Sequence, residues 1–207
     1  MRRATRITAA LLGASAGIAG LEHGYFEILQ GNVRPDSLMI ASMGSPCIPE
    51  EIWNNCEPAM TIIPNFLITG ILAIIIGLIT LVWAAAFVQR KRGGTVLILL
   101  SITLLLFGGG LFPPLIGIIA GVVANKINKP FSEKQKQRSG GALRFIAKLW
   151  PWPLVVYLLW VYGQFLVGHF FNAFLQDLMY ISLLLVIGSL LLSVYCGYAC
   201  DLQRSHD

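Results

Sequence analysis

The chain has 207 residues, of which 56% are hydrophobic and 12% are charged, and its net charge is +5. Globular domains carry about 25% charged residues, so this composition excludes an ordinary water-soluble domain and predicts an integral membrane protein whose main partner is the lipid bilayer. The basic residues stand between apolar runs, not on one water-exposed face, which argues against a nucleic-acid partner. In a multi-pass protein such residues mark the cytoplasmic side.

The first apolar run, from Ile7 to about Leu29, follows a basic start and predicts a transmembrane helix. A signal peptide cleaved near Ala14 to Ala16 is the alternative, although cleavage there would leave only a short apolar core. Four glycines recur on one narrow face of this helix, at Gly13, Gly17, Gly20 and Gly24. Because small residues let helices approach closely in lipid, this face predicts helix packing, for which a second copy of the chain or another membrane subunit is a candidate partner.

Residues 30–60 form a polar segment that contains several prolines and predicts an extracytoplasmic loop. Cys47 and Cys56 both lie in this loop. An oxidising compartment and this spacing predict a disulfide between them, which would contribute about 2 to 3 kcal/mol to stability. Cys196 and Cys200, one helical turn apart near the other end of the chain, are expected to serve as apolar packing residues.

Three further segments are apolar and long enough to cross a bilayer: Thr61 to Val88, Trp152 to Leu175, and Met179 to Cys200. The last two are separated by three residues and therefore predict an antiparallel helical hairpin. The fold class expected from these segments is an all-α, multi-pass membrane bundle with four firm transmembrane helices, forming a single membrane domain over residues 1–207.

The uncharged segment from Thr95 to Asn125 is too long for one straight span, since 31 residues of helix would reach about 45 Å across a hydrocarbon core of about 30 Å. Its midpoint carries residues that permit a turn or begin a new helix: Gly108, Gly109, Gly110, Pro113 and Pro114. The segment predicts a broken apolar hairpin. This hairpin either lines an ion or substrate site or is a tight turn between two short spans.

The basic residues support a hairpin that returns to the side it left. All lysines and arginines except Arg34 then fall on the cytoplasmic side, together with both chain termini, in a protein of the cell membrane. The basic loop at residues 126–150 would also be cytoplasmic. Within it, apolar residues at helical spacing from Leu143 to Trp150 predict an interfacial helix, with a solvated connector as the alternative.

Two groups of polar residues lie near the outer ends of apolar runs. The first helix carries Glu22, His23 and Glu27, and the span from Trp152 carries Gln164, His169 and Asn172. We interpret these six residues as candidate binding residues of an outward-facing polar pocket. Two alternatives are helix ends that meet water at the headgroup level, and a metal or haem site that uses the histidines.

The sequence favours small-solute or ion transport or binding through this pocket. A membrane enzyme or redox subunit that uses His23 and His169 is a second class, and a structural or assembly subunit of a membrane complex is a third. The sequence contains no Walker, HExxH, GxSxG or dinucleotide-binding motif, so neither a cofactor nor a catalytic residue is assigned.

Overall fold

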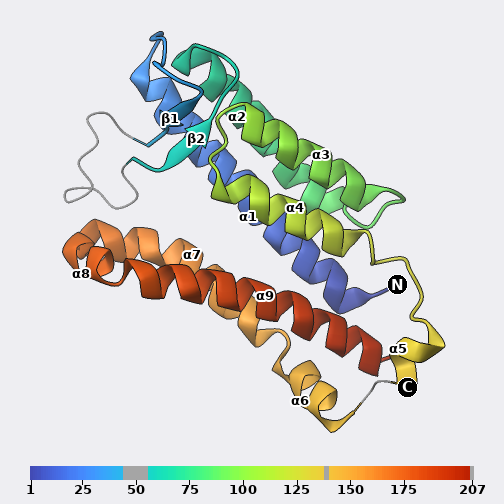
Figure 1. The fold of residues 1–207 in the computed structure, drawn as a ribbon. Coiled ribbons are helices and arrows are strands. Elements are labelled where there is room, and N and C mark those ends of the chain that lie inside the picture. Colours follow the sequence, from blue (N-terminus) through green and yellow to red (C-terminus); the bar gives the residue numbers. More distant parts are fainter. Residues whose placement is uncertain (44–55, 138–139, 206–207) are drawn as a thin grey trace. The chain divides into compact units, whose positions relative to one another are not determined.

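The computed structural model describes residues 1–43, 56–137 and 140–205. In this part of the chain, four helical segments are long and apolar enough to cross a membrane: Arg3–Gln30, Phe66–Phe87, Gly141–Phe170 and Met179–Gln203. The structure is helical apart from one small sheet, which confirms the predicted all-α helix bundle (Figure 1). The helices are α1 (Arg3–Gln30), α2 (Phe66–Val82, continued by a π-helical turn at Trp83–Phe87), α3 (Gly93–Leu106), α4 (Phe112–Ala124), α5 (Glu133–Gln137), α6 (Gly141–Leu149), α7 (Trp152–Phe170), α8 (Asn172–Asp177) and α9 (Met179–Gln203).

The chain divides into two compact units. Among the described residues, unit 1 contains 1–8, 126–137 and 140–205, and unit 2 contains 9–43 and 56–125. Unit 1 holds the start of α1 together with α5 to α9. Unit 2 holds the rest of α1, the small sheet and the helices α2 to α4.

In unit 2 the glycine face of α1 lies directly against α2. A methyl group added at Gly17 would stand 2.6 Å from the backbone nitrogen of Leu81 and 2.8 Å from the carbonyl oxygen of Gly77. One added at Gly24 would stand 2.7 Å from the carbonyl oxygen of Gly70. The two backbones are therefore in contact. Such contact is expected in lipid, where no hydrophobic force drives helices together and small residues allow close van der Waals packing.

The same face of α1 also meets α3. A methyl group at Gly13 would stand 2.9 Å from a Leu97 methyl, and one at Gly20 would stand 2.8 Å from a Leu104 methyl. The chain's own helices α2 and α3 thus cover the glycine face of α1, for which the sequence suggested a second copy or another subunit as partner.

The helices α3 and α4 form the predicted broken hairpin, with its turn at Gly108–Gly110. The helices pack closely, because a methyl group at Gly94 would stand 2.6 Å from the backbone nitrogen of Asn125. At 1.5 Å per residue, each helix is about 20 Å long, which is shorter than a hydrocarbon core of about 30 Å. Neither helix alone is therefore long enough to cross such a core.

The loop expected at residues 30–60 contains two short antiparallel strands, β1 (Met39–Ala41) and β2 (Pro58–Met60), with Ile40 opposite Ala59. An isolated bridge between Thr61 and Phe107 links this sheet to the end of α3. The sequence did not predict these strands, since neither is long enough to show an alternating pattern. The predicted Cys47–Cys56 disulfide involves Cys47, which lies outside the described residues, and it stays a prediction.

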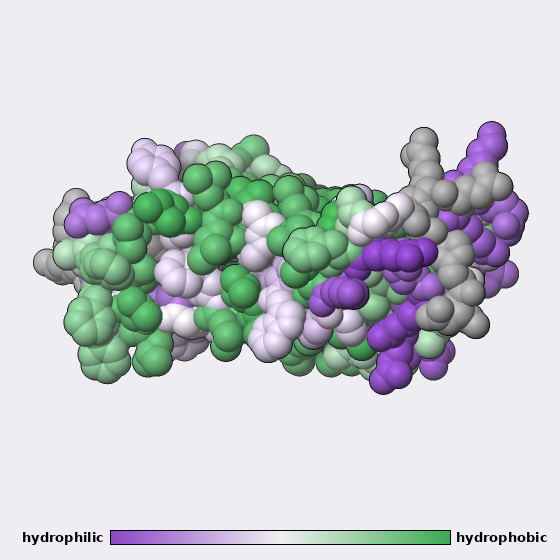
Figure 2. Space-filling view, turned by 90° about the horizontal axis from the view of Figure 1, so that it is seen from below, coloured by the Kyte–Doolittle hydropathy of each residue, from purple (hydrophilic) through white to green (hydrophobic). Residues whose placement is uncertain are grey.

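In unit 1, α7 and α9 pack as the predicted hairpin, although α7 ends at Phe170 and the short helix α8 follows it. Trp160 Nε1 donates to Ser182 Oγ at 2.9 Å, and Ser182 Oγ donates to Gln164 Oε1 at 3.1 Å. Apolar side chains cover much of the surface seen in Figure 2. On α7 and α9, Leu159 is 70% exposed and Leu184 is 72% exposed, as suits side chains in contact with lipid.

The predicted helix within the basic loop is α6, and it packs on α9. Its position at a membrane interface stays a prediction.

The last helix, α9, contributes Asp201, whose buried carboxylate accepts hydrogen bonds from the backbone of Ala4 at 2.9 Å and Thr5 at 2.7 Å. Since α1 has no acidic residue in its first turn, α9 supplies the cap for its amino terminus. Cys196 and Cys200 are buried free thiols on α9.

Candidate functional site

The candidate site lies in unit 2, where α1 presents His23 and Glu27 to the interior. Their exposed fractions are 1% and 0%. The two residues are four positions apart and share a helix face with Gly20 and Gly24, so the packing of α2 and α3 on that face encloses them as well. His23 and Glu27 therefore lie in the interior of unit 2 and not on its surface. Glu22 lies beside them and is half-buried.

Glu27 has one direct polar partner among the described residues. Ser42 Oγ donates to Glu27 Oε1 at 3.0 Å and also lies 3.3 Å from the carbonyl oxygen of His23. Ser42 is itself held in place, because its backbone nitrogen donates to the carbonyl oxygen of Glu57 and its own carbonyl accepts from Gln30 Nε2, both at 3.0 Å. The second carboxylate oxygen of Glu27, Oε2, is buried without a hydrogen-bond partner in the described part of the chain.

The turn of the α3–α4 hairpin closes over both side chains. Gly108 has a φ of 84° and Gly110 a φ of 81°, values that favour glycine. A methyl group at Gly108 would stand 2.5 Å from Glu27 Oε1 and 2.8 Å from its Cδ. One at Gly110 would stand 2.8 Å from two carbons of the His23 ring. The glycines are therefore needed both for the backbone conformation and for the space that the acid and the histidine occupy.

The sequence indicated the hairpin and the polar residues of α1 as separate features, and the structure brings them together. The backbone nitrogen of Gly108 donates to the carbonyl oxygen of Met60 at 2.9 Å, which ties the turn to β2. This contact joins the hairpin, the small sheet and α1 around one buried acid. No spacing rule in the sequence relates residues 23–27 to residues 108–110, and the common signal is only that both interrupt runs of apolar residues.

His23 faces a second acid that the sequence did not single out. Its Nε2 atom lies 3.8 Å from Glu57 Oε1, and the side chain of Glu57 is 21% exposed. The other ring nitrogen, Nδ1, has no hydrogen-bond partner within the described residues. Glu57 thus provides a partly exposed carboxylate next to the buried histidine. Its position directly before β2 could not be recognised without the sheet.

The remaining candidate residues belong to unit 1. His169 is exposed on α7 and lies edge-on to the neighbouring Phe170 ring, with 4.9 Å between centroids. Gln164 takes part in the hydrogen bonds with Ser182, and Asn172 begins α8. The convergence of His169 and Asn172 with His23 and Glu27 stays a prediction, because the two groups lie in different units.

The chemistry available at the site is that of a buried acid beside a histidine. Within residues 1–43, 56–137 and 140–205, no group of three or more His, Cys, Asp or Glu side chains is arranged to hold a metal ion. A carboxylate with one free oxygen can accept a proton or a small cation, and an imidazole can donate or accept a proton. The fold and this site define an all-α helix bundle, with helices long and apolar enough to cross a membrane, in which a broken helix encloses an ionisable pair. Comparison with family models, curated proteins and solved structures gave no match.

Proposed function

We propose that this chain is a membrane protein that binds a proton or a small monovalent cation at Glu27 and takes part in its transport. The observation that carries this proposal is the fully buried Glu27 carboxylate, whose Oε2 atom has no hydrogen-bond partner in the described part of the chain. Acids inside transmembrane segments are rare and usually mark ion or proton pathways.

The energetics favour a bound cation. Removing an ion from water costs several kcal/mol even after the protein relaxes. One hydrogen bond to a charged group contributes about 1.5 to 3 kcal/mol, and Ser42 supplies one such bond. Because this bond leaves a deficit, the carboxylate gains stability when a proton neutralises it or when a small cation pairs with it.

The broken hairpin supports the same proposal. Transporters commonly place ion sites where a helix is interrupted. The interruption leaves backbone groups without a partner inside the helix, and these groups can bind an ion in a cavity. Here the interruption at Gly108–Gly110 packs on Glu27 and His23 themselves. A tight turn with no ligand would be expected to pack on apolar side chains.

Glu57 and His23 offer a route between this site and the surface of unit 2. Glu57 is partly exposed and lies next to His23, which stands one helical turn from Glu27. A proton could pass along these three groups, because each can bind and release one. Under the proposed topology, with both termini and residues 126–150 cytoplasmic, this route leads to the extracytoplasmic side.

The test is an ion-flux measurement on the full chain reconstituted into vesicles. A potassium gradient with valinomycin sets the membrane potential, and a trapped pH dye reports proton entry; parallel samples measure uptake of labelled sodium. We expect flux of one of these ions through the unchanged protein and its loss in Glu27→Gln. The matched control is Asp36→Asn, which removes an exposed carboxylate from the same unit and is expected to keep the flux.

Folding is checked separately by circular dichroism and by elution from a sizing column. Absence of both proton and sodium flux through the unchanged protein would refute the transport proposal. Equal flux through unchanged protein and a folded Glu27→Gln variant would refute the role of Glu27.

A further inference from the structure

Unit 1 contains a pocket of about 590 Å³. The start of α1, the segment between α4 and α5, and the end of α9 form its walls. Its location is separate from the buried site in unit 2. No feature of the proposed ion site uses it.

The lining of this pocket is strongly basic. Five cationic side chains contribute to it: Arg2, Arg3, Lys129, Lys136 and Arg204. Asp201 is the one acid among its lining residues, and both of its carboxylate oxygens already accept backbone hydrogen bonds from the start of α1. Lys136 pairs with Glu133 at 2.8 Å, and the other four cations outnumber the single carboxylate of Asp201, so the pocket carries a net positive charge.

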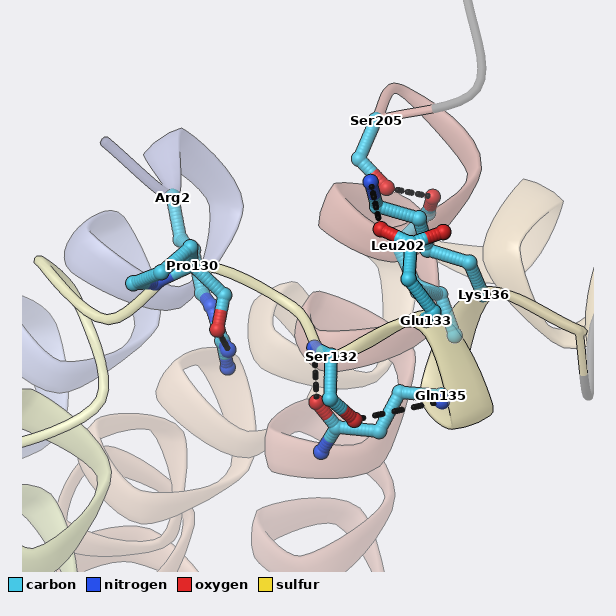
Figure 3. A network of polar contacts seen from close by, with 8 residues as sticks. All are labelled: Arg2, Pro130, Ser132, Glu133, Gln135, Lys136, Leu202 and Ser205. Carbon is cyan, nitrogen blue, oxygen red and sulfur yellow. Dashed lines mark hydrogen bonds and ion pairs between the residues drawn. The ribbon is translucent and has the colours of Figure 1, made fainter.

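Arg2 is held rigidly within this pocket. Its exposed fraction is 7%, its Nε donates to the carbonyl oxygen of Lys129 at 3.0 Å, and its guanidinium lies 3.7 Å from the centroid of the Phe131 ring. A second nitrogen donates to the carbonyl oxygen of Pro130 at 3.5 Å, and Figure 3 shows Arg2 lying alongside that proline. A fixed guanidinium loses little entropy when an anion binds, which favours binding.

The electrostatics of Arg2 point the same way. Burial lowers the pKa of the Arg2 guanidinium, and the nearby Tyr198 and Asp201 act in the opposite sense. Asp201 is already engaged by two backbone donors. A bound anion would stabilise the positive charge of the guanidinium and so offset the hydration that burial has removed.

We infer that this pocket binds a phosphate group, presented either by the headgroup of an acidic phospholipid or by a free phosphorylated solute. Guanidinium groups match phosphate oxygens in geometry and charge, and basic pockets at the ends of transmembrane helices recognise acidic headgroups. Basic residues that served only to orient the chain would need neither a concave pocket nor a buried arginine. The concave shape and the fixed Arg2 therefore favour a ligand over orientation alone.

The experiment compares two triple variants of the full chain purified in an uncharged detergent. The test variant is Arg3→Gln, Lys129→Gln and Arg204→Gln, which removes three exposed cations from the pocket. The control variant is Lys91→Gln, Arg144→Gln and Lys148→Gln, which removes three exposed cations that do not line it. Both variants keep Arg2, whose contacts contribute to folding.

Binding is measured by tryptophan fluorescence during titration with short-chain phosphatidylglycerol, with phosphatidylcholine of the same chain length as the neutral probe. Inorganic phosphate is titrated in a separate arm. We expect the test variant to bind the anionic probe about a hundredfold more weakly than the unchanged protein, since each basic residue contributes close to a factor of five to acidic-lipid binding. The control variant should retain its affinity.

The two arms distinguish the source of the phosphate. Binding of phosphatidylglycerol without binding of inorganic phosphate identifies a lipid headgroup, and binding of both identifies a site open to free phosphorylated solutes. The inference is overturned if neither probe binds the unchanged protein. It is also overturned if phosphatidylcholine binds equally well, or if the two triple variants lose affinity to the same extent.

Discussion

Replacing Gly108 by alanine tests whether the hairpin turn is built around Glu27. Two costs are expected. The first is backbone strain, because Gly108 has a φ of 84°, where a side chain with a Cβ costs about 1 to 2 kcal/mol. The second is steric, because the new methyl group would stand 2.5 Å from Glu27 Oε1, while carbon contacts are optimal at about 3.5 to 4.0 Å. Overpacking of this kind costs about 1 to 3 kcal/mol, so the total is about 2 to 5 kcal/mol.

Gly31 provides the matched control. Its φ of 81° is nearly the same, and a methyl group added there would meet nothing within 4 Å. Gly31→Ala should therefore cost only the backbone strain, about 1 to 2 kcal/mol. The difference between the two variants isolates the contact with Glu27.

The assay is the free energy of unfolding in maltoside micelles, measured by titration with sodium dodecyl sulfate and followed by circular dichroism. A double-mutant cycle adds Glu27→Ala, which removes the carboxylate and makes room for the methyl group. We expect Gly108→Ala to cost about 1 to 3 kcal/mol less in that background. If Gly108→Ala costs no more than Gly31→Ala, or if Glu27→Ala brings no relief, the proposed packing of the turn on Glu27 is wrong.

Two further substitutions test other contacts by the same titration. Gly17→Ala places a methyl group against the backbone of α2 and should destabilise the chain by about 1 to 3 kcal/mol. Gly188→Ala, at a position with open space in α9, should be neutral or slightly stabilising. Equal stabilities of the two variants would contradict the close approach of α1 and α2. Asp201→Asn weakens the cap on α1 and should cost about 0.5 to 2 kcal/mol, while Glu133→Gln, which breaks an exposed ion pair, should cost less than about 1 kcal/mol. A loss at Asp201 no larger than that at Glu133 would show that the cap contributes little.

The sequence alone determined the membrane class, the long helices and the broken hairpin. The reason is that a bilayer imposes a fixed thickness and requires every backbone group to be satisfied within its own segment, so length and hydropathy suffice to locate spans. The same grounds predict a hairpin over Thr95 to Asn125, since this segment is too long to cross once and carries glycines at its midpoint.

The tertiary structure decided which residues form the site. Helical spacing placed His23 and Glu27 on one face, but only packing showed that the face is buried and that Gly108 and Gly110 lie against them. The role of Glu57 depends on the pairing of β1 with β2, which no local sequence pattern predicts.

The capping of α1 could not be predicted from the sequence either, since the hydrogen bond between Thr5 and Asp201 joins residues 196 positions apart. Periodicity describes the neighbours of a residue along one helix. Contacts between distant segments arise only when whole helices pack, because their relative placement follows from the summed fit of many side chains and not from any single one.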